Sequence, residues 1–359
     1  MKIRLPTQLL ICFISSFLFG SYAYADTLKP TPSLHAKVIQ VMSKDPVNAS
    51  VSIEAELRDG QLHGQYIFIA RAPEALSVGE VFFVDIEKDP TDGSTQYLFA
   101  DYDRTRVDAI FIGMFILCAI VFGGIQGVRG LLSLAVSILL IFAVLLPGIA
   151  HGYSPAFLSI CVSFLVIVIG SYVTHGFNNA TSAAVIGMLA TLMLTGSLAY
   201  VGVHAGHLNG YAVEGASDFS ELGIATSYDF QSILFGAILI GLLGVLIDIA
   251  VGQAVAVEEL FRMDPRCSKT LMYQRGLRIG REHIGTLINI LAILYVSSAL
   301  PLLLLYLSPE LAFSIHRPLI NLEVFSTEII RVMIESIGLI LAVPITTLLS
   351  VFFLSPKTA

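Results

Sequence analysis

The sequence predicts an all-α bundle of about seven membrane-spanning helices, preceded by a small β-rich domain. Hydrophobic residues make up 55% of the chain and charged residues only 13%, and a water-soluble core of this size cannot hide so much apolar surface. Apolar runs that can cross a hydrocarbon layer of roughly 30 Å recur through residues 109–354. Residues 26–106 differ, because short alternating runs separated by glycine and proline are typical of strands and turns.

The N-terminus has the three parts of a secretory signal. Lys2 and Arg4 precede a short apolar stretch, and residues 23–25 supply a small-residue cleavage site. We therefore predict a signal peptide over residues 1–25. An uncleaved anchor helix is the alternative, although the apolar stretch is shorter than a typical span. In either case we expect the chain from residue 26 onward outside the plasma membrane.

Residues 26–106 are predicted to form this external β-rich domain. The run 51–57 alternates apolar and polar residues, and Asp59-Gly60 supplies a turn before the next run. About five such strands suggest a small barrel, for which an OB-like arrangement is one option. The domain contains no cysteine and therefore no disulfide framework. A barrel of this kind serves as a structural module or as a surface for an envelope protein partner.

The rest of the chain, residues 107–359, is predicted to form the helical bundle in the lipid bilayer. Small residues recur on one face of two spans, Gly187 and Thr191 in the fourth and Gly244 and Gly252 in the fifth, and such faces allow helices to pack closely. The expected spans are residues 108–125, 131–149, 155–173, 180–202, 231–253, 284–307 and 330–353.

The charges of two long loops predict the orientation of the bundle. The loop 203–229 contains acidic residues and no Lys or Arg, whereas the loop 254–283 is rich in arginine. By the positive-inside rule the first loop lies outside and the second in the cytoplasm. The same reasoning places the C-terminus in the cytoplasm.

Three segments carry a resemblance to a known family: residues 244–250 (GVLIDIA), 256–260 (AVEEL) and 276–289 (GLRIGREHIGTLIN). The chain resembles the YibE/F-like family of bacterial multi-pass membrane proteins. This resemblance implies a multi-pass protein of the bacterial inner membrane, with its β-rich domain in the periplasm, and it implies no reaction. The family usually carries Ser where this chain has Gly252, and Arg-Asp where it has Arg281-Glu282, so a role for a hydroxyl group at position 252 is not supported.

Charged and polar residues in these segments form the candidate site. Asp248 lies inside an apolar helix, where a carboxylate is costly and by default marks a partner, a cavity or a proton path. The functional hypothesis makes Asp248 a proton or cation acceptor. The structural alternative is an ion pair between Asp248 and Arg281 that fixes the register of two helices. The predicted intramembrane polar site comprises Asp248, Glu259, Arg278, Arg281, Glu282 and Asn289.

Two further pairs lie near the predicted outer end of the bundle. His204 and His207 share a helix face, and a metal bound there would need an acidic residue from the following loop. The alternative is that the histidines and the acidic residues of the loop are simply solvated by water. Arg331 and Glu335 are four residues apart in the last span, where we expect an interfacial ion pair.

The sequence contains no motif for catalysis or nucleotide binding, because it lacks H-E-x-x-H, G-x-S-x-G and a P-loop. We therefore expect no enzymatic activity and no cofactor, and the lack of basic tracts argues against nucleic acid as a partner. The prediction is a permease-like transporter of an unknown small solute or ion, coupled to a proton or ion gradient. The alternative is a non-transporting envelope scaffold or sensor whose external barrel binds a partner.

Overall fold

The computed structural model describes residues 34–45, 50–59, 62–88, 95–212, 219, 223, 227–307, 318 and 321–354. The predicted signal peptide lies outside these residues, as do Glu214, Asp218 and Glu221 of the acidic loop. The chain divides into two compact units, residues 1–122 and residues 123–359.

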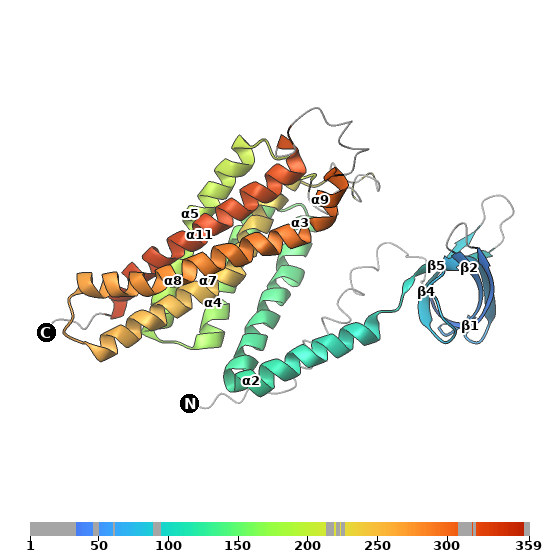
Figure 1. Cartoon of the computed structure of the whole chain (residues 1–359), viewed down its shortest axis with the longest axis horizontal. Coiled ribbons are helices and arrows are strands. Elements are labelled where there is room, and N and C mark those ends of the chain that lie inside the picture. The colour runs from blue at the N-terminus through green and yellow to red at the C-terminus, as the bar shows by residue number, and fades with distance from the viewer. Residues whose placement is uncertain are drawn as a thin grey trace. The chain divides into compact units, whose positions relative to one another are not determined.

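The first unit contains a five-stranded antiparallel sheet, which is the blue part of Figure 1. The strands pair in the order β3-β2-β1-β4-β5, and β3 also contacts β5, so the sheet nearly closes into a barrel. The predicted β-rich domain is thus confirmed, with the strand number and partial closure of an OB-like barrel. The strands are β1 (Leu34–Asp45), β2 (Ser50–Leu57), β3 (Tyr66–Pro73), β4 (Val81–Lys88) and β5 (Thr95–Tyr102).

The alternation of side chains along each strand forms the core of this barrel. In β2 every second residue is buried, because successive side chains of a strand point to opposite faces of the sheet. The large buried side chains include Ile53, Leu57, Ile69 and Phe82, each with 0% exposure. The sequence pattern at 51–57 therefore predicts the buried face correctly.

Helix α2 (Thr105–Leu140) contains a sharp bend at Gly124, where φ is 55° and ψ is −137°. Only glycine adopts such a conformation readily. Helical structure then continues through the π-helical turn η4 (Ile141–Leu145) and α3 (Leu146–Ala150). The two predicted spans therefore lie in one segment of 46 residues, which at 1.5 Å per residue is about 69 Å long and sufficient for two crossings of a layer of roughly 30 Å.

The described residues contain six helical segments that are long and apolar enough to cross a membrane, counting the 46-residue segment once. The prediction of a bundle with about seven spans is confirmed in this sense. The other five helices are α4 (Pro155–His175), α5 (Asn179–Ala205), α7 (Phe230–Met263), α8 (Lys269–Ser298) and α11 (Glu323–Leu354), and a short α9 (Leu300–Leu307) follows α8.

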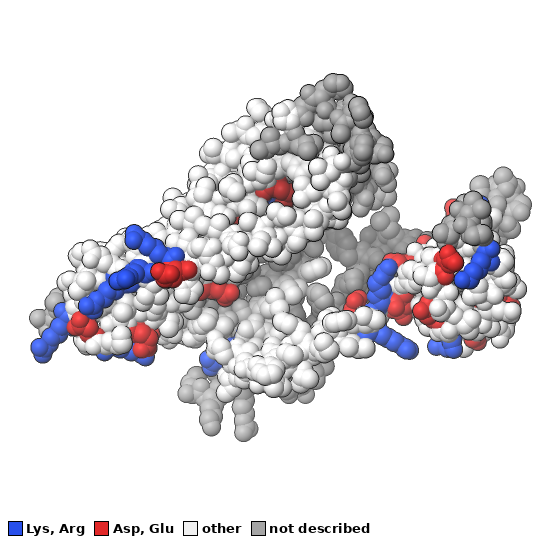
Figure 2. All heavy atoms as spheres, in the orientation of Figure 1, with Lys and Arg blue, Asp and Glu red and all other residues white. Residues whose placement is uncertain are grey.

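The segment 254–283, expected as a cytoplasmic loop, is mostly helical, because α7 and α8 extend into it and leave only residues 264–268 between them. Met272, Gly276 and Gly280 are buried, and the charged residues lie on the exposed side of the same helix ends. Figure 2 shows Lys and Arg gathered at this end of the bundle. The many charged residues of this segment, which predicted a loop, thus belong to the amphipathic ends of α7 and α8.

Helices α5, α7 and α11 form the centre of the bundle. Gly187 of α5 faces α11 so closely that a Cβ atom there would lie 2.6 Å from Thr346 Oγ1. The small-residue face predicted on α5 is therefore a packing face. By contrast, Gly244 and Gly252 of α7 have no described atom within 4 Å of a Cβ position, so this face of α7 is open.

The bundle has two distinct ends (Figure 1). α3, the last turn of α5 and α9 lie at one end, which we call the α5–α7 end. The turn between α7 and α8 lies at the other, which we call the α7–α8 end.

Candidate functional site

The structure does not bring the predicted polar residues together around Asp248. Asp248 lies on an exposed side of α7, and its electrostatic partner is His175, the last residue of α4. No ion pair among the described residues joins Asp248 to Arg281. Neither the register-fixing ion pair nor a closed site of these residues is therefore formed within one chain.

The other predicted residues are spread over the exposed surfaces of α7 and α8. Glu259 accepts a hydrogen bond of 2.8 Å from Arg262 within the last turns of α7. Arg278, Glu282 and Asn289 are exposed on α8, and their spacing places them on one face of the helix. This face has no described partner within the bundle.

A different carboxylate lies buried in the bundle, that of Glu335 in α11, with 1% exposure. Its Oε2 accepts a hydrogen bond of 2.6 Å from the hydroxyl group of Tyr295 in α8. Arg331, one turn earlier in α11, places its Nε 3.5 Å from Oε1 of the same carboxylate. The arginine also lies over the Tyr295 ring, 5.5 Å from its centroid. Two helices thus supply three polar groups to one buried point.

The third wall of this site is Gly241 of α7. A Cβ atom at this position would lie 2.8 Å from Glu335 Oε1 and 3.7 Å from the Tyr295 hydroxyl oxygen, so glycine leaves the space that the carboxylate occupies. Glu335 Oε1 has no hydrogen-bond partner among the described residues. One carboxylate oxygen is therefore held by tyrosine, while the other faces the Arg331 guanidinium at 3.5 Å without a formed hydrogen bond.

Charged groups continue from Glu335 towards the α5–α7 end. Arg331 has 22% side-chain exposure, and Glu328, one turn further, lies 3.9 Å from its Nη1. The sequence predicted the pair of Arg331 with Glu335, but as an interfacial contact. Burial of Glu335 and the participation of Tyr295 were missed, because neither follows from spacing along a single helix.

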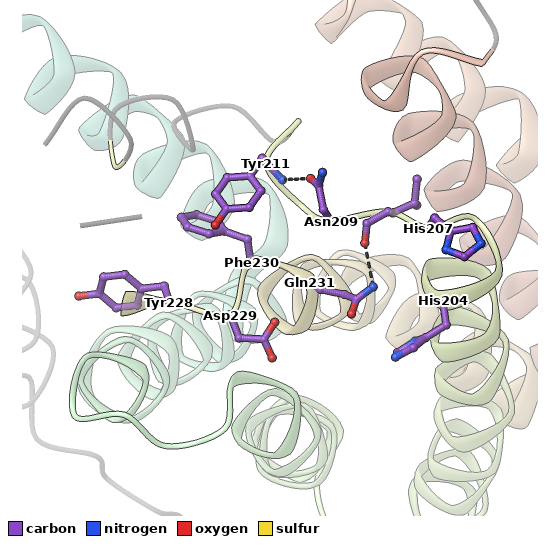
Figure 3. Close-up of a pocket in the computed structure, with 9 residues that line it drawn as sticks. His204, His207, Asn209, Tyr211, Tyr228, Asp229, Phe230 and Gln231 are labelled. Carbon is purple, nitrogen blue, oxygen red and sulfur yellow. Dashed lines mark hydrogen bonds between the residues drawn. The ribbon is translucent and has the colours of Figure 1, made fainter. Parts of the chain in front are cut away.

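A cavity of about 530 Å³ opens at the α5–α7 end (Figure 3). Figure 3 shows side chains from the end of α5, the following turn and the start of α7 around it. We call it the mouth pocket. It is lined by His204, His207, Leu208, Asn209, Tyr211, Tyr228, Asp229, Phe230 and Gln231.

The turn that forms this pocket is rigidly built. Leu208 is buried with 1% exposure, and its carbonyl oxygen accepts a hydrogen bond of 2.9 Å from Gln231 Nε2, drawn as a dashed line in Figure 3. His207 has a φ of 49°, which is uncommon for any residue except glycine. A Cβ atom at Gly210 would lie 2.2 Å from the carbonyl oxygen of Phe230, so only glycine fits.

The two histidines of the pocket do not form a metal centre with described residues. No group of three or more His, Cys, Asp or Glu residues suited to a metal ion occurs in the part of the chain that the structure describes. His204 Nδ1 is hydrogen-bonded to the carbonyl oxygen of Tyr200, 2.9 Å away. The acidic residues Glu214 and Asp218, considered as further ligands, lie outside the described ranges.

Comparisons with known proteins identify one family. A family model described as "YibE/F-like protein" matches residues 111–356, in agreement with the resemblance of the segments between residues 244 and 289. No curated protein and no solved structure matches the chain.

Proposed function

Given that the chain belongs to the YibE/F-like family, we propose that it is a permease-like secondary transporter of the bacterial plasma membrane. A proton or another cation bound at Glu335 drives it, and the solute is small. The mature chain begins after a cleaved signal peptide, its barrel lies in the periplasm, and its C-terminus lies in the cytoplasm. The proposal includes no enzymatic step and no cofactor.

The observation that carries this proposal is the buried carboxylate of Glu335. A carboxylate inside a membrane-spanning helix is costly, and it is tolerated where it faces protein or a cavity and takes part in ion movement. Tyr295 fixes one oxygen of Glu335 at 2.6 Å, while the other is paired only with Arg331 at 3.5 Å and has no hydrogen bond. An acceptor that is oriented but not saturated is suited to bind and release a proton or a small cation.

Charged groups between Glu335 and the α5–α7 end support access of a cation to Glu335 from that end. Arg331 and Glu328 lie on the same helix, one and two turns towards the α5–α7 end, where the mouth pocket also lies. A solute that enters at this end meets the pocket first. The contact of α5 with α11 is tight on both sides of Glu335, at Gly187 and at Gly202, so transport requires this interface to move.

The purified full chain in sealed vesicles tests the proposal. With a pH-sensitive dye inside, we expect a change of internal pH when a panel of small solutes is added. The variant Glu335→Gln should abolish the change at equal protein content, since the amide cannot exchange a proton. Glu282→Gln, which alters an exposed carboxylate of α8, is the matched control. An unchanged response of the Glu335 variant would rule out Glu335 as the coupling group.

A second candidate function is supported by the barrel. Tyr66 and Phe68 of β3 are 63% and 55% exposed and lie on one face of the strand, as expected of a surface that binds a partner. In a non-transporting scaffold or sensor this surface binds an envelope protein. A photo-crosslinking residue at position 68 of the full chain should then give one discrete product in cells, and none from a site on the opposite face of the barrel.

A further inference from the structure

We propose that the mouth pocket binds a small organic cation, an amine, a guanidinium or a quaternary ammonium group. The pocket would be the outer recognition site of the transporter, so this inference rests on the proposed function and adds the class of its solute. His204 and His207 would line the site without holding a metal.

The shape of the pocket is suited to a small molecule. Its volume of about 530 Å³ falls in the usual range for ligand sites, roughly 300–1,000 Å³. The hydrogen bond from Gln231 to Leu208, and that from the backbone N–H of Asn209 to Glu323 Oε1 at 2.7 Å, hold its rim. The positive φ of His207 is a local strain of the kind that concentrates at binding sites.

Aromatic rings supply the first part of the recognition chemistry. Tyr211, Tyr228 and Phe230 line the pocket, and the rings of Tyr211 and Phe230 lie 4.8 Å apart at 37°. Phe230 is 7% exposed, and Phe219 packs edge-on against it and against Tyr228. Tyr211, by contrast, is 46% exposed, so its ring is available to a ligand. The face of an aromatic ring carries negative charge and attracts ammonium and guanidinium groups.

Charge supplies the second part. The pocket lining includes the carboxylate of Asp229 and no Lys or Arg, and the whole segment 203–229 carries only acidic charges. The C-terminal end of α5 also lies at the pocket, where helix carbonyl groups favour a cation. The opposing N-terminus of α7 is capped by Asp229, whose two carboxylate oxygens accept from the backbone N–H of Ser232 at 3.1 Å and from its hydroxyl group at 2.5 Å. The carboxylate of Asp229, the acidic segment and the C-terminal end of α5 all disfavour an anion, whereas the N-terminus of α7 does not.

Direct binding to the purified full chain in detergent tests this inference without any gradient. Calorimetric titration would use choline, n-butylammonium and guanidinium, with 3,3-dimethylbutan-1-ol as the uncharged isostere of choline and Zn²⁺ as the competing metal. We expect at least one cation to bind, and the isostere to bind about tenfold or more weakly, as loss of a cation–π contact implies. Absence of binding by all three cations, or equal binding of the isostere, overturns the inference. Binding of Zn²⁺ alone does the same.

Two pairs of variants locate the site. Asp229→Asn keeps an N-cap acceptor of equal quality but removes the charge, and should weaken cation binding about tenfold. Asp264→Asn at the other end of α7 is its control, because Asp264 caps the C-terminus of the same helix. Tyr211→Ala should weaken binding, whereas Tyr153→Ala, at an exposed residue before α4, should not. Equal affinity in Asp229→Asn and Asp264→Asn places the cation elsewhere.

The two proposals fail in different ways. Glu335→Gln should stop flux and leave cation binding unchanged. If no cation binds while flux still depends on Glu335, only the pocket assignment is wrong. If cations bind in the pocket and no flux occurs, the transport proposal is wrong and the pocket belongs to a sensor.

Discussion

At the scale of single residues, burial distinguishes the two carboxylates that lie in apolar helices. Asp248 and Glu335 both lie in apolar helices, but only Glu335 is buried and hydrogen-bonded to a second helix. Sequence reasoning selected Asp248, because a carboxylate in an apolar run stands out and the flanking motif belongs to the family. It could not select Glu335 with Tyr295, since the two residues are 40 positions apart and their meeting depends on how α8 lies on α11.

Removal of the Tyr295 hydroxyl group tests the energetic part of this site. In Tyr295→Phe the buried Oε2 of Glu335 loses its donor, and an unsatisfied buried group costs about 1–3 kcal/mol. We expect lower thermal stability in detergent for this variant. Tyr200→Phe serves as control, since Tyr200 is 58% exposed. Equal melting temperatures for the two variants would show that the hydrogen bond contributes nothing.

In the barrel, the contact of His35 with Asp59 makes stability depend on pH. The ring and the backbone N–H of His35 are both hydrogen-bonded to Asp59 Oδ2, and the ring contact in particular holds the pKa of Asp59 below its ordinary value of 3.8. Because the folded-state pKa is lowered, the stabilisation is complete above the ordinary value and is lost as the pH falls through the folded one. Pulse proteolysis of the full chain in urea should show the barrel weakening below about pH 4. Asp59→Asn should remove this acid-dependent component.

At the scale of elements, glycines on one helix have opposite roles according to what they face. On α8, a Cβ atom at Gly280 would lie 2.3 Å from Val343 Cγ1 of α11, whereas Gly285 has nothing within 4 Å. At the same interface, Gln253 of α7 donates hydrogen bonds of 2.7 Å to the carbonyl oxygen of Gly276 and to Thr347 Oγ1. Three helices are thus joined where Gly276 and Gly280 allow them to approach.

Two substitutions on α8 separate packing from helix propensity. Gly280→Ala should destabilise the bundle by about 1–3 kcal/mol, because the added methyl group overpacks the contact with α11. Gly285→Ala should be neutral or stabilise by up to about 1 kcal/mol, since alanine is the better helix former and the site is open. Thermal unfolding of both variants in the same detergent measures the difference. Equal stability of the two would contradict the close contact at Gly280.

Much of the architecture could be predicted from local patterns, but the contacts could not. Strand alternation at 51–57 and the apolar runs predict the barrel and the spans, because both depend on short-range periodicity. The segment 254–283 was expected as a loop although most of it is helical, since frequent charges hid an amphipathic period with Met272, Gly276 and Gly280 on its buried face. His204 and His207 of the mouth pocket could be singled out from the sequence. The aromatic side of the pocket could not be predicted, because it forms only where the start of α7 lies beside the end of α5.

At the scale of the whole molecule, the distribution of charge and the order of helices predict one topology. The α7–α8 end carries the arginines of residues 262–281, whereas the segment 203–229 at the α5–α7 end carries acidic residues and no Lys or Arg, so the positive-inside rule predicts a cytoplasmic location for the first. Under the proposed topology, the mouth pocket would face the periplasm. The proposed entry of the solute and the alternative in which the barrel binds an envelope protein both depend on this topology.

A native cysteine makes this topology directly testable. Cys267 lies in the turn between α7 and α8 and is partly exposed, whereas Tyr153, between α3 and α4, is 66% exposed at the α5–α7 end. In intact cells without an outer-membrane barrier, a membrane-impermeant maleimide should label Tyr153→Cys and leave Cys267 unlabelled until the membrane is opened. The reason is that an odd number of spans separates the two positions. Labelling of Cys267 from outside would show that the bundle has the opposite orientation. The mouth pocket would then face the cytoplasm and would be an exit site for its solute.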